Sequence, residues 1–365
     1  MRVIFAGGGT GGHLYPGLAI ARAIARLDPG ADLLFVGARR GIEARVLPES
    51  GFRHVLLDLY PLFRRQVWKN LETAGSLVDS WLKVGDLMRA NPPSVVVGLG
   101  GYASGVTLAW SVAHRIPIVQ QAGDSIPGLA ARIFSRWSRV LYVGFPEAVE
   151  RLPRSRRTDV VITGNPIEPP PSPRPSKAAS LVNLGFPGAS GRERVVLVFG
   201  GSQGSFAINE AVDDWVGRGL PADVRVIWAT GSNRWEEYRQ RESSQVVVKP
   251  YLSPISDAYA ACDLAVTRAG AMTCAELAAW GIPAIMIPLP SAAADHQTGN
   301  ARAVEAGGAG VLLPERDLSA SSLSQTVLSL LGDQASLASM SAAARDRGRS
   351  DAAETIARDI LARFT

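Results

Sequence analysis

The chain begins with MRVIFAGGGTGGHLYPGLAIARAI, residues 1–24, in which a short apolar run meets a glycine-rich loop and then an alanine-rich segment. The run at 3–5 predicts a buried strand, and the segment after Pro16 predicts a helix. Glycines between them let the backbone pass close to a ligand, and a helix N-terminus attracts negative charge. The stretch therefore predicts an anion or nucleotide site, with the imidazole of His13 beside it as a base.

The same pattern recurs along the chain, because β-branched runs alternate with helical segments, as is typical of parallel βαβ units. A second glycine-rich turn, GGSQGS at 200–205, follows the apolar run 194–199 and leads into another predicted helix. Between the two halves, proline density at 164–180 argues against helix and inner strand. We therefore predict an α/β protein with two Rossmann-like, doubly wound parallel-sheet domains and an active cleft between them. The expected strands cover 3–6, 33–36, 54–58, 95–97, 116–120, 140–143 and 160–163, then 195–199, 224–229, 246–249, 264–267, 284–287 and 311–313.

These patterns predict four segments along the chain. An N-terminal domain covers 1–163, a proline-rich linker covers 164–191, and a C-terminal domain covers 192–345. Residues 346–365 predict an amphipathic helix that packs back on the N-terminal domain, because Ile356, Ile360 and Leu361 share one side.

Composition limits the possible classes of protein. With 365 residues, 47% of them apolar and 19% charged, the chain has a globular rather than a disordered composition. Its two cysteines, Cys262 and Cys274, cannot build a disulfide framework, so we expect reduced thiols. The apolar start is too short for a signal peptide. Residues 95–113 carry no charge over about the length of a membrane span, but their glycines favour strand, loop and helix instead.

The first glycine loop alone allows other interpretations. Gly7, Gly9 and Gly12 match the dinucleotide pattern G-x-G-x-x-G, but Arg39 and Arg40 follow the second strand where an NAD site places an acid. A dehydrogenase is therefore possible only as an NADP enzyme. No P-loop motif occurs in the chain.

The second half holds two more candidate sites. At 200–204, Ser202 and Gln203 could bind a diphosphate at the helix start, or Ser202 could simply cap the helix. Thr273 and Glu276 have the spacing of a capping box, yet the loop before them is nearly free of side chains, so Glu276 could instead accept hydrogen bonds from ribose hydroxyls. Gln297, in a polar stretch, can donate to and accept from sugar hydroxyls.

Taken together, these stretches resemble the peptidoglycan N-acetylglucosaminyltransferase family, which adds the second sugar to undecaprenyl-diphosphate-linked muramyl pentapeptide and so makes lipid II. The resemblance implies an inverting glycosyltransferase of GT-B architecture that uses UDP-N-acetylglucosamine and lies at the cytoplasmic face of the bacterial inner membrane. The matching pieces occur in family order and are GGGTGGHLYPGLAIA, GLGGYASG, GNP, FGGSQGS with Asn209, RAGAMTCAELAAWGIPAIMIPLP and DHQTGNA.

The resemblance also assigns roles to matching positions. His13 would be the general base, and an imidazole can accept a proton near neutral pH. Thr10, Gly11 and Gly12 would border the donor diphosphate and sugar, and Ser202 and Gln203 would contact the phosphates. Leu252 would lie against uracil, Glu276 would bind the ribose hydroxyls and Gln297 the transferred sugar. The rest of the uridine site would be Ala271, Met272, Thr273, Cys274 and Ala275.

The chain departs from the family pattern in two places. Asp124 stands where the family has an asparagine, in a stretch that also lacks the family's histidine and glutamate, and Glu168 stands where the family usually has an arginine. An acid near a diphosphate would repel it, so these changes concern the acceptor side. A related UDP-sugar transferase with another lipid or small-molecule acceptor stays open for this reason, as does a non-catalytic nucleotide-sugar binding protein.

Partners follow from charge and from the resemblance. The net charge of +5 permits a phosphate, nucleotide or anionic lipid partner. The stretch 59–84 mixes aromatic and basic residues, and Arg132, Arg136, Trp137 and Arg139 could extend it into a surface that binds an anionic membrane, although an ordinary helix packed on its own sheet explains it too. The expected substrates are UDP-N-acetylglucosamine and a polyprenyl-diphosphate-linked acceptor. We expect no nucleic acid and no cofactor. We also expect no metal ion, since the N–H donors at the helix starts can stabilise the diphosphate and no Asp-x-Asp motif occurs.

Overall fold

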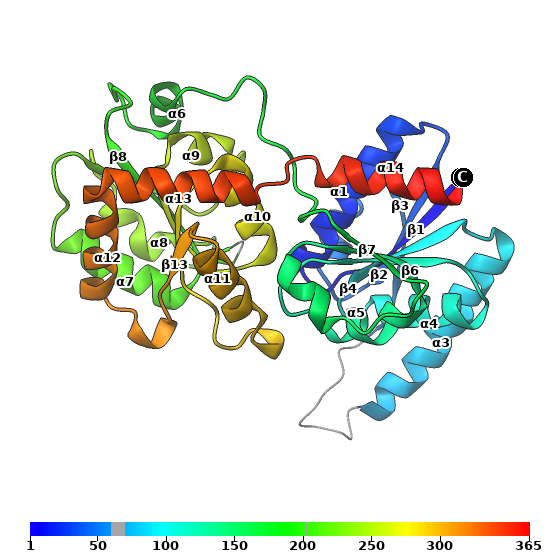
Figure 1. The fold of residues 1–365 in the computed structure, drawn as a ribbon. Coiled ribbons are helices and arrows are strands. Elements are labelled where there is room, and N and C mark those ends of the chain that lie inside the picture. The colour runs from blue at the N-terminus through cyan, green and yellow to red at the C-terminus, as the bar shows by residue number, and fades with distance from the viewer. Residues whose placement is uncertain (60–69, 202) are drawn as a thin grey trace. The chain divides into compact units, whose positions relative to one another are not determined.

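The computed structural model describes residues 1–59, 70–201 and 203–365, with side chains described outside 60–74 and 202. The chain divides into two compact units (Figure 1). The N-terminal unit combines Met1–Glu168 with Ser350–Thr365, and the C-terminal unit is Pro169–Arg349. Unit boundaries therefore fall after 168 and 349, a few residues beyond the expected ends at 163 and 345.

The N-terminal unit is a seven-stranded sheet in which all the described strand pairs are parallel. Its elements are β1 (Arg2–Gly7), α1 (Gly11–Leu27), β2 (Asp32–Ala38), α2 (Glu43–Val46), β3 (Arg53–Leu57), α3 (Asn70–Ala90), β4 (Val95–Gly100), α4 (Ser104–Ala113), β5 (Ile118–Ala122), α5 (Leu129–Phe134), η2 (Ser135–Trp137), β6 (Ser138–Val143), η3 (Pro146–Arg151), β7 (Asp159–Ile162) and α14 (Ala352–Phe364). The order β3-β2-β1-β4-β5-β6-β7 reverses between β1 and β4, so the first glycine loop leaves the sheet at its switch point.

The C-terminal unit repeats this plan with a six-stranded parallel sheet. Its elements are α6 (Lys177–Leu184), β8 (Arg194–Phe199), α7 (Phe206–Gly217), β9 (Val224–Ala229), α8 (Trp235–Tyr238), η4 (Arg239–Arg241), β10 (Val246–Lys249), α9 (Ser256–Ala261), β11 (Leu264–Thr267), α10 (Ala271–Trp280), β12 (Ala284–Met286), η5 (Ala293–Asp295), α11 (His296–Ala306), β13 (Gly310–Leu312), η6 (Glu315–Asp317), α12 (Ala320–Gly332) and α13 (Gln334–Arg347). The order β10-β9-β8-β11-β12-β13 places the second glycine loop at the switch point between β8 and β11.

Each sheet buries both of its faces, which explains the continuous apolar strands seen in the sequence. In the N-terminal unit, one face packs against α1 and α14, whose Ile24, Ile356 and Ile360 are fully buried. The opposite face packs against α3 and α4 through Val84 and Leu108. Figure 1 shows α14, in red, beside α1, in blue. Each such side chain contributes about 1.5–3 kcal/mol when it is fully buried.

The sequence predictions for the fold are largely confirmed. Every expected strand is present, and both described sheets are parallel, as predicted for two doubly wound domains. Residues 95–113 form β4, a turn and α4, and among the described residues no helix combines the length and apolar character needed to cross a membrane. One helix starts earlier than expected. The sequence predicted it after Pro16, whereas α1 begins at Gly11 and includes Pro16.

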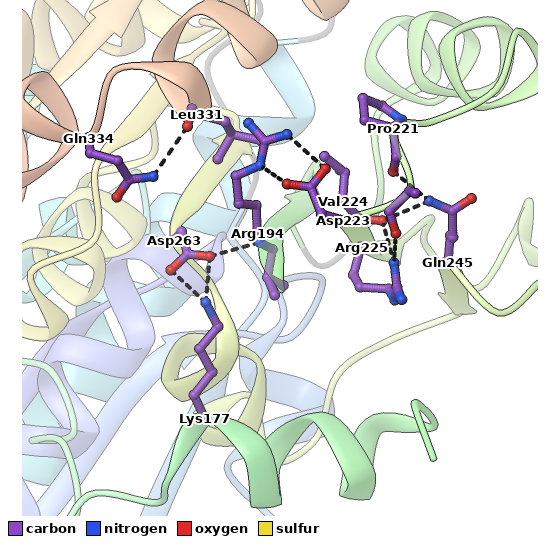
Figure 2. Close-up of polar contacts among 12 residues, drawn as sticks. Lys177, Arg194, Pro221, Asp223, Val224, Arg225, Gln245, Asp263, Leu331 and Gln334 are labelled. Carbon is purple, nitrogen blue, oxygen red and sulfur yellow. Dashed lines mark hydrogen bonds and ion pairs between the residues drawn. The ribbon is translucent and has the colours of Figure 1, made fainter. Parts of the chain in front are cut away.

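The proline-rich segment differs from its prediction. Helix α6 starts at Lys177, inside the stretch that was expected to exclude helix, because Pro175 is the last of the prolines and Ser176 caps the helix by accepting from the Ala179 N–H. Lys177 donates to both oxygens of Asp263, at 2.7 and 2.6 Å, which ties α6 to the second sheet (Figure 2). Most of the expected linker, from Pro169 onward, is therefore part of the C-terminal unit.

Candidate active site

In the N-terminal unit, the first glycine loop delivers His13 to the carboxyl edge of the sheet. The loop leaves β1 at Gly7, and Thr10 is the N-cap of α1, with no side-chain bond to the helix backbone. Instead, the Thr10 Oγ1 lies 3.0 Å from the Nδ1 of His13. Thr10 and Gly12 are exposed, and Gly11 and His13 are half-buried. Four predicted site residues therefore follow one another at the start of one helix.

A different glycine-rich turn, GLGG at 98–101 at the end of β4, lies against the imidazole of His13. Gly100 and Gly101 have φ values of +90° and +73°, which favour glycine. A Cβ on Gly100 would lie 2.9 Å from the Cδ2 of His13, and one on Gly101 would lie 2.0 Å from the carbonyl oxygen of Gly8. The turn GLGG thus lets the backbone approach both the His13 ring and the first loop. This gives a physical reason for two of the glycines in that turn.

Asp124 lies in the loop after β5, at the same edge of the sheet, and is half-buried. The buried Asn165 organises this loop, since its Nδ2 donates to the Gly123 carbonyl and its Oδ1 accepts from the Nε2 of Gln121, each at 2.9 Å. A Cβ on Gly144 would meet the Asn165 amide at 2.3 Å. Asn165 therefore joins the loops that follow three strands, a role that the motif GNP alone did not reveal.

In the C-terminal unit, the second glycine loop is locked to the loop that follows β9. A Cβ on Gly204 would lie 2.0 Å from the Thr230 carbonyl oxygen, and one on Gly231 would lie 2.5 Å from that of Gln203. The buried Asn209 donates to the same Thr230 carbonyl at 2.9 Å. Helix α7 is capped by Ser205, so the interpretation of Ser202 as its cap is wrong. Ser202 itself lies outside the described residues, while Gln203 is exposed beside the loop.

Helix α10 carries most of the predicted uridine site. Its N-cap is Gly270, which puts Thr273 three residues and Glu276 six residues into the helix, so the two do not form a capping box. Cys274 is buried, whereas Ala271, Met272, Thr273, Ala275 and Glu276 are half-buried.

A buried tyrosine lies behind Glu276. The hydroxyl of Tyr259, on α9, donates to the Oε2 of Glu276 at 2.6 Å. Burial, followed by the nearby Glu276 carboxylate, raises the pKa of Tyr259 well above its ordinary value, so the phenol stays a donor. The sequence offered no signal for this pair beyond an aromatic residue in an alanine-rich helix.

Gln297 and Leu252 complete the predicted donor residues at this edge. The Gln297 Oε1 accepts from the Leu289 N–H at 2.9 Å. The Nε2 group of Gln297 is therefore the part of the side chain that can donate to a sugar hydroxyl. Leu252 follows β10 and is buried. The buried Asn300 donates to the Ala269 carbonyl at 3.0 Å and so ties α11 to the loop that precedes α10.

Arg268 is a residue that the sequence analysis missed. It follows β11 and is only 9% exposed. Its guanidinium donates to Ser205 Oγ at 2.7 Å and to the carbonyls of Ile287 and Pro288 at 3.2 and 3.1 Å, and it pairs with Glu315. One side chain thus joins the loops after β8, β11, β12 and β13. A charged residue directly after an apolar strand, in a loop of glycine and alanine, was the available signal.

A pocket of about 400 Å³ lies at the opposite, amino edge of the second sheet, near Lys177, Arg194 and Asp263. Two of its cations pair with carboxylates, since Lys177 binds Asp263 and Arg194 binds Asp223 through two hydrogen bonds of 2.6 and 2.9 Å (Figure 2). None of the predicted donor residues belongs to this pocket. Ligands of open α/β sheets bind at the carboxyl ends of the strands, so the glycine-loop edge is the candidate site.

Comparison with known proteins places both units in one family. Residues 3–143 match the glycosyltransferase family 28 N-terminal domain, and residues 195–356 match the family 28 C-terminal domain. The chain is 41% identical to UDP-N-acetylglucosamine–N-acetylmuramyl-(pentapeptide) pyrophosphoryl-undecaprenol N-acetylglucosamine transferase of Salinibacter ruber, over 99% of this chain and 96% of the relative. It is 37% identical to the protein of the same name from Moorella thermoacetica, over 99% and 98%.

Solved structures share the fold. A crystal structure of Acinetobacter baumannii MurG matches with a TM-score of 0.78 at 23% identity, over 99% of each chain. A putative UDP-N-acetylglucosamine 2-epimerase from Listeria monocytogenes matches with a TM-score of 0.68 at 15% identity, so the fold alone does not distinguish the reaction. The GT-B architecture predicted from the sequence is confirmed. Because curated relatives are 37–41% identical over 99% of the chain, the chain belongs to glycosyltransferase family 28, among the N-acetylmuramyl-(pentapeptide) pyrophosphoryl-undecaprenol N-acetylglucosamine transferases.

Proposed function

We propose that this chain transfers N-acetylglucosamine from UDP-N-acetylglucosamine to the 4-hydroxyl of N-acetylmuramyl pentapeptide on undecaprenyl diphosphate, converting lipid I to lipid II in peptidoglycan synthesis. The observation that carries the proposal is the 41% identity over 99% of the chain to a relative named for this reaction. The sites at the carboxyl edges of the two sheets provide residues suited to each step.

The C-terminal unit binds the donor in this proposal. Ser202 and Gln203 contact the diphosphate, where the second glycine loop and the N-terminus of α7 favour negative charge. Leu252 packs against uracil, and Glu276 accepts hydrogen bonds from the ribose hydroxyls, held by Tyr259 at 2.6 Å. Gln297 donates to the transferred sugar. The backbone and side chains of 271–275 line the nucleoside. As the leaving diphosphate gains charge, the positioned N–H donors stabilise it most.

The N-terminal unit supplies the base. His13 accepts the proton of the muramyl 4-hydroxyl, with Thr10 fixing its ring through the 3.0 Å contact at Nδ1. The hydroxyl attacks the anomeric carbon from the face opposite UDP, which inverts the α linkage to β. Gly11 and Gly12, without side chains, leave room for the two sugars, and Asp124 borders the acceptor.

The decisive experiment supplies purified full-length protein with UDP-N-acetylglucosamine and a short-chain lipid I. Formation of the β-linked disaccharide on the lipid supports the proposal. Consumption of the donor only with another acceptor would replace it with the second candidate, a transferase of different acceptor specificity. That candidate is favoured by Asp124 and by the exposed Glu168, two acids on the unit proposed to bind the acceptor. UDP binding without turnover of any acceptor would indicate a non-catalytic binding protein.

Replacing His13 by Ala tests its role as the base. We expect the His13→Ala variant to lose about 10²- to 10⁴-fold in kcat, the usual contribution of a general base, while its UDP affinity changes little. His54→Ala is the matched control, because His54 is half-buried on β3 and has no proposed contact with substrate. Steady-state kinetics and calorimetry with UDP measure both quantities. Unchanged turnover in His13→Ala would exclude the imidazole as the base.

The lipid-linked acceptor requires the enzyme to reach a bilayer, and we assign this to the exposed apolar side chains of α3 and α5–η2 in the N-terminal unit. Leu77, Val78, Trp81 and Leu82 are 36–62% exposed on α3, and Leu129, Ile133 and Trp137 are 47–55% exposed on α5 and η2. The neighbouring Arg132, Arg136 and Arg139 are exposed as well and attract anionic lipid. Lys83 is paired with Asp79 at 2.7 Å. The aromatic and basic side chains between 60 and 74 that were predicted to belong to this surface lie outside the described residues. We propose that this surface holds the protein peripherally on the cytoplasmic face of the bacterial inner membrane.

A further inference from the structure

Glu43 is a buried acid beneath the first glycine loop that no step above uses. It begins the one-turn helix α2 and is fully buried. Its Oε1 accepts from the Gly9 N–H at 2.8 Å and from the Ala38 N–H at 3.1 Å. The same oxygen thus binds the loop after β1 and the end of β2.

Three glycines make the space for this carboxyl group. A Cβ on Gly8 would lie 1.7 Å from Oε1, one on Gly41 would lie 2.0 Å from Oε2, and one on Gly37 would lie 2.9 Å from Cγ. Gly8 also has a φ of +139°, which disfavours any other residue. The sequence around Glu43 is therefore shaped to admit the carboxylate against the loop.

The burial of Glu43 is unfavourable by itself. Its Oε2 is buried and has no hydrogen-bond partner among the described residues. A buried carboxyl oxygen without a partner destabilises a fold, and an apolar side chain would fill the space without that cost. The ring of Tyr102 lies next to Gly9, where an added Cβ would meet it at 2.8 Å. Burial, followed by the nearby Glu43 charge, raises the pKa of Tyr102.

The hydrogen bond from Gly9 leads directly to the proposed base. Gly9 precedes Thr10, the N-cap of α1, whose Oγ1 lies 3.0 Å from the His13 Nδ1. The bond from the Gly8 N–H to the Gly100 carbonyl is 3.4 Å long, beyond the usual range, so the 2.8 Å bond to Glu43 is the shorter restraint on this loop. A loop of glycines has a high conformational entropy and needs such restraints to stay in one conformation.

We propose that Glu43 is a positioning residue, whose carboxylate holds Gly9 and thereby Thr10 and His13 in the conformation that presents the imidazole to the acceptor hydroxyl. Its effect on turnover rests on the proposed function, whereas its effect on the His13 ring does not.

Two variants remove the restraint in different ways. Glu43→Ala deletes the acceptor. Gly41→Ala keeps it but places a methyl group within 2.0 Å of Oε2, which forces the carboxylate away from Gly9, and Gly41 has no left-handed φ to oppose alanine. Glu49→Gln, at an exposed position in the same segment, controls for the change at Glu43. Gly332→Ala, where an added Cβ meets nothing within 4 Å, controls for the change at Gly41.

Two measurements on the full chain read out the effect. The chain has four histidines, so ¹³C labelling of histidine gives a resolvable ring resonance for His13, assigned with His13→Ala. In Glu43→Ala and Gly41→Ala we expect this resonance to shift or broaden while those of His114 and His296 stay in place. We also expect kcat for lipid I to fall about tenfold or more, with UDP affinity within about twofold of the parent. Glu43→Gln, which keeps an acceptor oxygen, should restore most of the turnover.

Several outcomes would overturn the proposal. An unmoved His13 resonance with kcat close to that of the parent would do so, as would equal movement of all the histidine resonances, which indicates general unfolding. If Glu43→Ala does not fold, Gly41→Ala alone decides. A parent protein without transferase activity defeats the proposed function, and the His13 resonance still tests Glu43.

Discussion

At the scale of single residues, buried polar side chains hold the residues proposed to touch substrate. Arg268 joins four loops in the C-terminal unit, Asn165 joins three in the N-terminal unit, and Tyr259 holds Glu276. Their partners lie far away in the chain, since Arg268 and Ser205 are 63 positions apart and Gln121 and Asn165 are 44 apart. Local patterns cannot predict such pairs, because they form only after the strands have been ordered into a sheet.

Tyr259→Phe tests whether this support matters for donor binding. The change removes the hydrogen bond to Glu276, so the carboxylate is no longer held in place for the ribose hydroxyls. We expect UDP affinity to fall about tenfold, or about 1.4 kcal/mol, by isothermal titration calorimetry. The same substitution should reduce the affinity for 2′-deoxy-UDP, which lacks one of the ribose hydroxyls, by a smaller factor than the affinity for UDP.

Tyr238→Phe is the matched control for this experiment. Tyr238 is also buried in the C-terminal unit, and its hydroxyl donates to Glu210 at 2.7 Å, but neither residue belongs to the proposed donor site. Its UDP affinity should match that of the parent. Equal losses in both variants would show a general effect on stability and would remove the specific role of Tyr259.

At the scale of elements, each of the two glycine loops is shaped by a neighbouring loop. The sequence correctly indicated a strand, a glycine turn and a helix at each place, but it misjudged where several helices begin, since α1 starts at Gly11 rather than after Pro16. Glycine 270, rather than Thr273, precedes α10, and Ser205, rather than Ser202, caps α7. Several residues near each start have cap chemistry, and the strand length and the packing of the turn select among them.

Helix α3 provides an element-scale prediction about membrane binding. One face packs in the core through Val84 and Met88, whereas Val78 and Leu82 are 62% and 54% exposed. Replacing both exposed residues by Asp removes apolar area and adds negative charge, without opening a cavity. We expect binding to phosphatidylglycerol-containing vesicles to fall about tenfold or more in co-sedimentation, with UDP affinity unchanged.

The control for this helix is Val182→Asp, because Val182 is 51% exposed on α6 in the other unit. It adds one of the two negative charges of the α3 double variant, at a comparably exposed valine. Vesicles of phosphatidylcholine alone carry no net charge, so binding to them measures the apolar contribution to membrane binding without the ionic one. Undiminished binding of the α3 double variant to both kinds of vesicle would exclude α3 as the membrane surface.

At the scale of the whole molecule, the last helix belongs to the unit that contains the first strand. Helix α14 buries Ile356 and Ile360 in the N-terminal core, and Tyr142, on β6, donates to Asp359 at 2.8 Å. Arg363 adds ion pairs to Asp359 and to Asp159, which precedes the β7 valines. The N-terminal unit is therefore complete only when the C-terminal end of the chain has been made.

Ile356→Ala tests this dependence. The variant leaves a cavity against α1 and should cost about 2–5 kcal/mol, all of it in the N-terminal unit. Hydrogen exchange followed by mass spectrometry should show faster exchange in peptides from β1 and α1, with no change in peptides from β8 and α7. Val182→Ala, at an exposed position, serves as the control. Faster exchange in both units, or in neither, would contradict the assignment of α14 to the first unit.

Local sequence alone was enough to predict the order of strands and helices and the two sheets, because apolar periodicity and glycine spacing act over neighbouring residues. The family was predicted from the resemblance of several motifs, in order along the chain, to a known family. The sequence also identified His13, Glu276 and Gln297 as candidates by their chemistry. Only the folded chain determined that Glu43 lies under the first glycine loop, that Tyr259 holds Glu276 and that Arg268 joins four loops. Packing of the last helix on the first domain was predicted from the sequence, and the fold supplies its contacts through Ile356 and Ile360. These contacts join residues from different strands and helices, and their geometry depends on sheet order and side-chain packing, which no short stretch of sequence contains.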